Sequence, residues 1–391
     1  MRILHTADWH LGKTLEGRSR FREQEQFVDE LVSIVKQEQI DVVLIAGDAF
    51  DSVNPPAAAE QLFYESIARL SDNGKRPVVV IAGNHDHPDR LSATSVLAAA
   101  HSITLLGLPT TDVQTIYVPS CEETLVLAAL PYPSESRLAQ LLASENDEKQ
   151  LRKQYDEKVG EIFAAMNERF RDDTVNIAMS HLYVAGGATS DSERPIEVGG
   201  AYTVSPERFP SRAQYVALGH LHRPQSVGRS GMPARYSGSP LAYSFSEAGY
   251  AKSVTIVDVH PRQEANVSEI LLSSGRPLVK WKATEGVAQV YRWLDEGKDR
   301  NAWIDLEINV EHSLTLEEIH RLRKLYDGFI YIRPHFLTKE EMVQETREHV
   351  AIETLFERFY EKQTGGAKPT NELVQLFLEL LADEDEDGDD Q

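Results

Sequence analysis

Residues 41–51 read DVVLIAGDAFD, an apolar run of strand character that ends in a glycine and two aspartates. Four other segments place polar residues after a similar apolar run, at residues 2–6, 77–82, 175–180 and 214–218. The five polar groups are Asp8-Trp9-His10, Gly47-Asp48-Ala49-Phe50-Asp51, Gly83-Asn84-His85-Asp86, His181 and Gly219-His220-Leu221-His222. In a sheet covered by helices, the loops at the strand ends converge on one crevice where ligands bind. The sequence therefore predicts one shared site built from five distant segments.

The first 107 residues alternate strand and helix. Helices are expected over 22–37, which buries Phe27 and Leu31, and over 55–70. Strand–helix–strand units of this kind imply parallel strands with right-handed crossovers. The charged segment 134–171 is expected to form one or two amphipathic helices that cover the sheet. The fold class is therefore α/β, or α+β when the whole chain is considered.

Later segments indicate further units. Residues 277–336 read strand, helix, strand, helix, strand, which predicts a small α+β module. Residues 338–360 and 371–381 read as helices, separated by a breaker at 364–369. We therefore divide the chain into domains at 1–275, 276–337, 338–381 and 382–391.

The last predicted helix carries more apolar surface than a lone terminal helix would leave in water. Its apolar residues are Leu373, Val374, Leu376, Phe377, Leu380 and Leu381. We therefore do not expect this helix to stand alone in water.

Composition sets the broad class. At 391 residues the chain is long enough for two or more domains. The single cysteine, Cys121, cannot form an intramolecular disulfide, which favours a cytoplasmic protein. The chain opens on a strand and not on a signal peptide. Its apolar runs are far shorter than the roughly twenty residues that span a bilayer, so no membrane location is expected.

The net charge of −22 argues against general attraction to nucleic acid, which requires clustered lysine and arginine. Seven of the acidic residues lie between Asp383 and Asp390, and such a tail is expected to be disordered. If DNA is the substrate, then local basic patches, bound cations or a partner must supply the attraction.

The polar groups have the chemistry of metal ligands. In extended backbone, residues i and i+2 project to one face, so Asp8 and His10 are expected to reach one ion together, as are His220 and His222. Glycines precede Asp48, Asn84 and His220, where the chain has to turn sharply. Mixed oxygen and imidazole ligands suit manganese, iron or zinc better than magnesium alone.

This order of motifs resembles the calcineurin-like metallophosphoesterase superfamily. The resemblance implies a β-sandwich flanked by helices and a site for two divalent metal ions. It implies that Asp8, His10 and His222 bind one ion, that Asn84, His181 and His220 bind the second, and that Asp48 bridges both. His85 would protonate the leaving oxygen or stabilise the charged phosphorus centre. Metal-bound water is acidified toward neutral pH in such sites.

Three further segments resemble the SbcD family of bacterial double-strand-break nuclease subunits. They are the opening MRILHTADWHLGK, GHLHRP at 219–224 and YSGSPL at 236–241. The family implies a manganese-dependent nuclease of DNA repair, recombination and replication, with double-strand 3′-to-5′ exonuclease and single-strand and hairpin endonuclease activity. It also implies that residues 276–337 form a DNA-contacting capping domain.

The same resemblance implies a partner. The C-terminal helices would dock on an SbcC-type SMC-like ATPase, whose ATP cycle would control access to duplex DNA. A homodimer within a heterotetramer, associated with the nucleoid, is implied as well. Basic residues that we expect to meet DNA phosphates are Lys13, Arg18, Arg20, Arg22, Arg90 and Arg223.

Several alternatives stay open at this point. A small-molecule phosphodiesterase or phosphatase would explain the ligands and the acidity, but not the added modules. A non-catalytic scaffold would be expected to have lost ligands, and here all of them are present. Trp9 and His5 are expected to pack in the core. The sequence leaves open whether Asp51 and Asp86 take part in catalysis, and which metal, oligomer and tail function apply.

Overall fold

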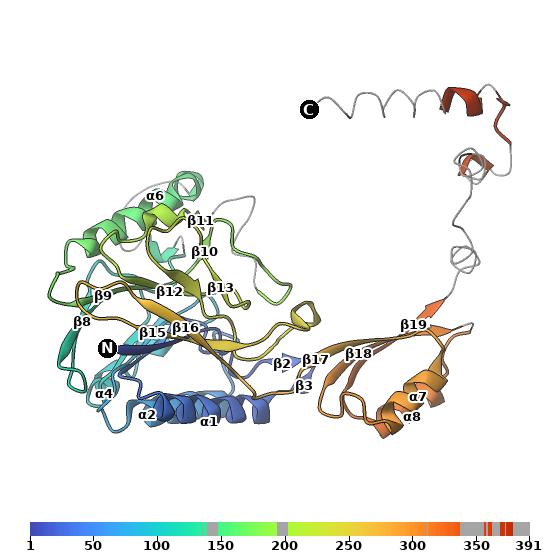
Figure 1. Cartoon of the computed structure of the whole chain (residues 1–391), viewed down its shortest axis with the longest axis horizontal. Coiled ribbons are helices and arrows are strands. Elements are labelled where there is room, and N and C mark those ends of the chain that lie inside the picture. Colours follow the sequence, from blue (N-terminus) through green and yellow to red (C-terminus); the bar gives the residue numbers. More distant parts are fainter. Residues whose placement is uncertain are drawn as a thin grey trace.

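The computed structural model describes residues 1–134, 136–138, 148–193, 202–310 and 312–336, and a few positions between 356 and 377. Two six-stranded sheets stack face to face in its larger part (Figure 1). The first sheet has the order β16-β15-β1-β4-β5-β6, and the second has the order β13-β14-β12-β9-β8-β7. The sandwich implied by the superfamily is confirmed.

The first sheet holds a parallel block flanked by an antiparallel edge. Its strands are β1 (Arg2–Thr6), β4 (Val42–Ile45), β5 (Val78–Ile81), β6 (Ile103–Leu106), β15 (Ser253–Asp258) and β16 (Asn266–Leu271). β1, β4, β5 and β6 pair in parallel, whereas β15 runs antiparallel to β1. The helices α1 (Phe21–Gln37) and α2 (Ala57–Ser71) connect the parallel strands and cover the outer face of the sheet (Figure 1).

The second sheet carries the other half of the sandwich. Its strands are β7 (Gln114–Val118), β8 (Glu123–Leu130), β9 (Val175–His181), β12 (Tyr215–Gly219), β13 (Gln225–Ser226) and β14 (Ala234–Tyr236). Helix α6 (Glu148–Asn167) packs on its outer face through Val159, Phe163 and Met166. The charged segment that begins at 134 therefore does supply a covering helix. The β7–β8 hairpin was not anticipated from the sequence.

Between the sheets lies a dry core of aliphatic side chains. Ile3, Leu44 and Val79 from the first sheet meet Leu127, Ile177 and Ala217 from the second. Strands that are buried on both faces consist of continuous apolar residues, and for this reason these strands could be predicted from the sequence. The layers are therefore helix, sheet, sheet, helix.

Short elements complete this part. They are β2 (Thr14–Leu15), β3 (Arg18–Ser19), α3 (Pro88–Ser92), α4 (Ser95–Ala99), β10 (Tyr183–Val184), β11 (Thr203–Val204), and the 3₁₀ helices η1 (Pro206–Arg208) and η2 (Phe245–Glu247). In the part of the chain described, no helix is both long and apolar enough to cross a membrane.

Residues 278–336 form a separate α+β module to one side of the sandwich (Figure 1). A parallel sheet of β17 (Leu278–Ala283), β18 (Trp303–Val310) and β19 (Phe329–Phe336) is joined by α7 (Val287–Asp295) and α8 (Leu316–Leu325). This is the element order that the sequence predicted for the segment. A capping box at Thr315 and Glu318 begins α8.

The α+β module packs on the sandwich through a small apolar cluster. Leu15, Phe245, Leu278, Trp303 and Ile330 form this cluster. Glu23 of α1 accepts hydrogen bonds from Trp303 Nε1 at 3.0 Å and from the Arg276 backbone at 2.6 Å. A buried polar group with satisfied partners fixes the orientation of the two parts.

At the C-terminal end, Phe356 and Phe377 stack with ring centroids 4.1 Å apart. Residues 359–361 and 373–377 are helical. Leu373, Val374, Leu376 and Phe377 of the predicted docking helix are described, whereas Leu380 and Leu381 and the acidic tail lie outside the described residues.

Candidate metal centre

The five polar groups meet at one edge of the sandwich, where the parallel strands end. Asp8 and His10 follow β1, Asp48 follows β4, and Asn84 follows β5. His181 is the last residue of β9, and His220 comes directly after β12. Both sheets therefore contribute, and residues more than two hundred positions apart come together.

Asp8, His10 and His222 form the first group. One ligand atom from each lies within 4.8 Å of the others, and all three side chains are buried. The Nε2 atoms of His10 and His222 face each other at 3.0 Å. Two imidazole nitrogens aimed at one point are the arrangement that a shared cation would stabilise.

Asp48 lies between this group and a second one. Its Oδ2 is 3.7 Å from His10 Nε2 and 3.4 Å from His181 Nε2. His181 Nε2 is also 2.9 Å from Asn84 Oδ1. Asp48 therefore occupies the place that a bridging carboxylate would need.

His220 joins the site through its backbone and its ring. Its amide donates to both carboxylate oxygens of Asp8, at 3.0 and 3.1 Å, and its ring lies 5.5 Å from that of His181. The structure thus brings together every residue that the sequence proposed as a ligand. The donor set of carboxylates, imidazoles and one amide suits divalent metal ions.

The backbone that presents these ligands differs from the expected one. Asp8, His10 and Asp48 have φ of 55°, 46° and 51°, and His220 has φ of 104°. The idea that extended backbone aligns Asp8 with His10, and His220 with His222, is therefore wrong. Left-handed turns direct these side chains instead. Non-glycine residues in this region carry local strain that clusters at functional sites.

Two glycines allow the ligand loops to approach one another. A Cβ on Gly47 would lie 2.2 Å from His181 Nδ1, and one on Gly83 would lie 2.1 Å from Asp48 Oδ1. Each glycine therefore accommodates a neighbouring ligand side chain.

Burial and charge set the protonation of the site. Burial holds the pKa of His10 and of His220 well below the usual range, so both rings are neutral as a metal ligand must be. Burial also acts to lower the pKa of His181, but the Asp48 carboxylate raises it to about 9. Burial raises the pKa of Asp8 to about 7, against the effect of His181. The Asp48 carboxylate therefore favours the charged form of His181.

His85 lies beside this group. Its backbone N–H donates to Asp48 Oδ1 at 2.8 Å, and its Nδ1 lies 2.7 Å from the Asp51 carbonyl oxygen. Nδ1 then donates to that carbonyl, and Nε2 is the atom that faces the site, 4.0 Å from Asp48 Oδ2. His10, Asp51 and His85 also form a group whose ligand atoms lie within 4.8 Å of one another, so a proton-donor role for His85 stays a prediction.

The two aspartates left open by the sequence have different surroundings. Asp86 accepts from the backbone N–H groups of Gly83, Ala49 and Phe50, so it joins two ligand loops. The Asp51 carboxylate pairs with Lys13 at 2.8 Å and lies 3.6 Å from His10 Nδ1. The Asp51 backbone carbonyl accepts from His85 Nδ1, and the Asp51 carboxylate lies near both His10 and His85.

Sequence reasoning missed several residues around the ligands. Arg137 donates to the carbonyl oxygens of Gly83, Tyr132 and Asp86, which fixes the loop of Asn84. Ser192 and Glu247 lie behind His222. Burial acts to raise the pKa of Glu247, but hydrogen bonding and Lys252 hold it well below the usual range. The sequence pattern Ser244-x-x-Glu247 is typical of a capping box and could have indicated a structural role for Glu247.

The predicted DNA-contact residues fall into two kinds. Arg18, Arg22, Arg90 and Arg223 are exposed and Lys13 is half-buried. Arg20 is buried, pairs with Glu23 at 2.5 Å and donates to the Ala242 carbonyl at 2.9 Å. Its guanidinium is committed to Glu23, which also accepts from Trp303 of the α+β module, so its place does not suit a phosphate contact. Trp9 and His5 are both buried in the core, as expected.

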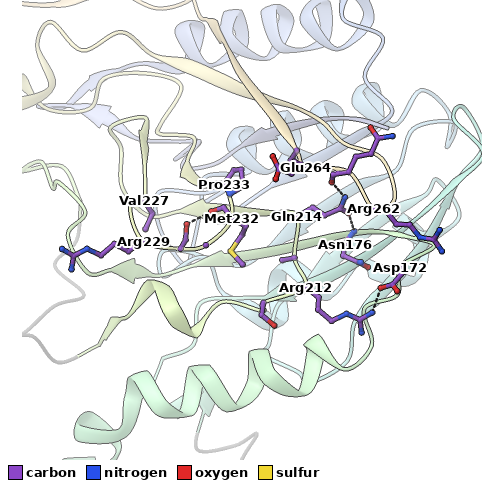
Figure 2. A pocket seen from close by; sticks show the side chains of 16 residues that line it. Asp172, Asn176, Arg212, Gln214, Val227, Arg229, Met232, Pro233, Arg262 and Glu264 are labelled. Carbon is purple, nitrogen blue, oxygen red and sulfur yellow. Dashed lines mark hydrogen bonds and ion pairs between the residues drawn. The ribbon is translucent and has the colours of Figure 1, made fainter.

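A cavity of about 780 Å³ lies at the opposite ends of the strands (Figure 2). It is lined by Asn176 and Gln214, at the start of the segments that end in His181 and Gly219. Some of its polar side chains bond within the lining: Gln214 Oε1 accepts from the Asn176 backbone at 2.9 Å, and Arg212 pairs with Asp172 at 2.8 Å. It is therefore separate from the ligand cluster.

Comparison with known proteins agrees with this geometry. A family model described as calcineurin-like phosphoesterase matches residues 1–224. A second, described as type 5 capsule protein repressor C-terminal domain (SbcD_C), matches residues 274–364. The fold and the first match define a calcineurin-like phosphoesterase.

Individual relatives identify the family within this class. The SbcD subunit of the nuclease SbcCD of Bacillus subtilis (strain 168) is 64% identical over 388 residues, which covers 99% of each chain. The same-named protein of Staphylococcus epidermidis is 30% identical over 395 residues, covering 98% of this chain and 99% of the relative. That of Rhodobacter capsulatus is 37% identical over 282 residues, 66% of each. The chain belongs to the SbcD family.

Proposed function

We propose that this chain is the nuclease subunit of an SbcCD-type complex and hydrolyses DNA phosphodiesters. The observation that carries the proposal is the convergence of Asp8, His10, Asp48, Asn84, His181, His220 and His222 at one edge of the sandwich. The 64% identity of this chain to a nuclease subunit, over 99% of each chain, supports DNA as the substrate. DNA repair, recombination and replication are the processes in which such a subunit would act.

In this proposal Asp8, His10 and His222 hold one divalent ion, and Asn84, His181 and His220 hold a second. Asp48 bridges the two. Manganese suits this mixture of oxygen and imidazole ligands. Bound cations would supply an acidified water and would stabilise charge on the phosphate oxygens. The Asp8 N–H donates to the Gly47 carbonyl and the His10 N–H to the Asp48 carbonyl, both at 3.0 Å, and these bonds would hold the ligand loops in place for the ions.

His85 is the proposed proton donor to the leaving oxygen. Its Nδ1 is occupied by the Asp51 carbonyl, so Nε2 is the nitrogen that carries a proton to the site. The Asp48 contact to its backbone keeps the ring beside the ligands. A positioned imidazole of this kind typically contributes 10²–10⁴-fold to rate.

The remaining parts receive roles from the family. Residues 1–275 would be the nuclease domain and 276–337 the DNA-contacting cap. Residues 338–381 would dock on an SbcC-type SMC-like ATPase, with Leu376 and the Phe356–Phe377 stack in the contact. We propose exonuclease action on double-stranded ends in the 3′-to-5′ direction and endonuclease action on single strands and hairpins. A homodimer within a heterotetramer, in the cytoplasm at the nucleoid, completes the proposal.

For phosphate contacts we retain Lys13, Arg18, Arg22, Arg90 and Arg223. Arg18 and Arg22 are exposed and lie on β3 and at the start of α1, next to the α+β module that would form the cap. The chain as a whole carries −22, so we assign most of the duplex attraction to the bound cations and to the ATPase partner.

The test is cleavage of an end-labelled DNA hairpin by the purified chain in Mn²⁺, with and without an SbcC-type ATPase and ATP. We expect cutting that requires Mn²⁺ and increases with the ATPase and ATP. Brisk hydrolysis of a simple phosphodiester without any DNA cleavage would reject the proposal and favour a small-molecule phosphodiesterase or phosphatase.

A further inference from the structure

His222 is held from behind as well as from the metal side. Its Nδ1 lies 2.6 Å from the Ser192 hydroxyl oxygen, and that oxygen lies 2.6 Å from Glu247 Oε1. An ionised carboxylate can only accept, so Ser192 donates its proton to Glu247. Its oxygen then accepts from Nδ1–H of His222. This order leaves the Nε2 lone pair of His222 directed at the site, where His10 Nε2 lies at 3.0 Å.

Glu247 is itself fixed on every side. It is 1% exposed and accepts from the backbone N–H groups of Tyr243 at 2.9 Å and Ser244 at 3.1 Å. Its other oxygen pairs closely with the Lys252 ammonium. A buried carboxylate is costly unless it is paired and hydrogen-bonded, and here both oxygens have donors.

Lys252 closes the network on His222. Besides Glu247, its Nζ donates to the His222 carbonyl oxygen at 2.9 Å and to the Ser239 hydroxyl at 2.9 Å. All three ammonium hydrogens are therefore used. Ser192 acts on the ring of His222 and Lys252 on its backbone, while Glu247 connects the two.

The network also reaches the α+β module. Glu247 is the last residue of η2, and the first, Phe245, packs in the apolar cluster with Leu278 and Trp303. The ring of Phe245 lies 5.9 Å from that of Tyr331 on β19. One short helix thus contacts the α+β module at one end and the support of a ligand at the other.

We propose that Ser192, Glu247 and Lys252 are positioning residues that hold His222 in one tautomer and one orientation for a divalent cation, and that η2 makes this support depend on the seating of the α+β module. The inference rests on the proposed metal site. Partners of this kind that orient a ligand histidine typically account for 10–100-fold in metal affinity.

The test measures Mn²⁺ binding to the full chain by equilibrium dialysis and electron paramagnetic resonance. We expect Ser192→Ala to bind one of its two Mn²⁺ ions about 10–100-fold more weakly. Ser192→Thr, which retains the hydroxyl, should restore the affinity. Ser180→Ala is the matched control, because Ser180 is buried next to His181 but its hydroxyl donates to the Leu130 carbonyl oxygen.

The outcomes separate the two proposals. If the unaltered chain binds two Mn²⁺ ions and Ser192→Ala binds both with unchanged affinity, the positioning role is rejected while the proposed function stands. If the unaltered chain binds no Mn²⁺, both are rejected. A merely structural role predicts lower stability in Ser192→Ala and Ser180→Ala alike, with equal Mn²⁺ affinity, and that result also overturns the inference.

A second pair of matched variants tests whether the α+β module affects the support of His222 through η2. Phe245→Leu should weaken the same Mn²⁺ ion several-fold, since it loosens η2. Phe329→Leu makes the same change in the separate core of the α+β module and should leave Mn²⁺ affinity unaltered. Equal Mn²⁺ affinities in Phe245→Leu and the unaltered chain would remove the link through η2.

Discussion

The Nε2 atoms of His10 and His222 face each other at 3.0 Å with their rings inclined by 65°. Both rings are buried, and burial keeps His10 neutral. Two lone pairs at this distance repel unless a proton or a cation lies between them. A divalent ion bound here would take both nitrogens as ligands.

Metal binding should accordingly raise thermal stability. We expect the melting temperature to fall when Mn²⁺ is removed with a chelator and to recover when it is restored, since binding at 100 times Kd adds about 2.7 kcal/mol. Differential scanning fluorimetry would measure the shift. His222→Ala should lose most of it, whereas His101→Ala, at an exposed position, should retain it. An equal shift in both variants would contradict the assignment of His222.

His85→Ala should abolish cleavage without loss of metal. The ring contacts the Asp51 carbonyl and lies 4.0 Å from Asp48, and we expect it to transfer a proton and not to bind metal. We expect the rate to fall by about 10²–10⁴-fold while two Mn²⁺ ions stay bound. His87→Ala, two residues on and exposed, is the control and should cut normally. Loss of one ion from His85→Ala would make His85 a ligand instead.

The segment around Asp8 and His10 shows how much of the fold could be predicted from the sequence. The apolar run before them predicted β1 with its observed bounds, and the similar runs before Asp48 and His181 were right to within one or two residues. The period of the hydrophobic residues and the positions of the glycines are local properties, so they can be read from a single sequence. The convergence of the five groups followed from the rule that strand ends meet.

The rest depended on contacts between distant segments. Nothing local shows that the Asp8 and His10 backbone is left-handed, because the alternation of residues suggested a strand. Nothing local shows that Arg20 is buried, because its partner Glu23 also accepts from Trp303, 280 positions farther along the chain. Ser192 and Glu247 belong to different loops and gain their role only behind His222.

Arg20 and Arg18 should behave differently. Removing one partner from a buried ion pair typically costs 3–5 kcal/mol, so Arg20→Ala should lower the free energy of unfolding by about that amount. Chemical denaturation would measure it. Arg18→Glu, two residues away but exposed, should leave stability within about 0.5 kcal/mol and weaken DNA binding at low salt. Equal stability of the two variants would show that the Arg20–Glu23 pair does not support the fold.

Truncation after Tyr360 should separate cutting from its control by ATP. The deletion removes Phe377 and its stack on Phe356, together with the apolar residues proposed to dock on the ATPase. The sandwich and the α+β module remain complete, so Mn²⁺-dependent cutting of single strands should persist. Full ATP stimulation of the truncated chain, measured with an SbcC-type ATPase, would exclude 371–381 as the docking segment.

His5 should make the fold less stable in mild acid. It lies in β1, fully buried, with Nδ1 2.9 Å from the Tyr215 hydroxyl on the facing sheet. Burial lowers its pKa to about 3 from 6.5. In the unfolded chain the ring binds a proton below about pH 6.5, whereas in the folded chain it stays neutral. Stability from this group is therefore complete above pH 6.5 and is lost as the pH falls from 6.5 toward 3.

The expected loss from His5 between pH 7 and pH 5 is about 2 kcal/mol. Urea denaturation of His5→Asn at both pH values should show a correspondingly smaller drop than the unaltered chain, because asparagine keeps a polar partner for Tyr215 but does not titrate. Other groups that titrate in this range cancel in the comparison. His101→Asn removes an exposed imidazole and should leave the drop unaltered. An equal drop in the free energy of unfolding of His5→Asn would mean that the sandwich core admits the protonated ring or water. The two sheets would then be less tightly packed near His5 than its burial indicates.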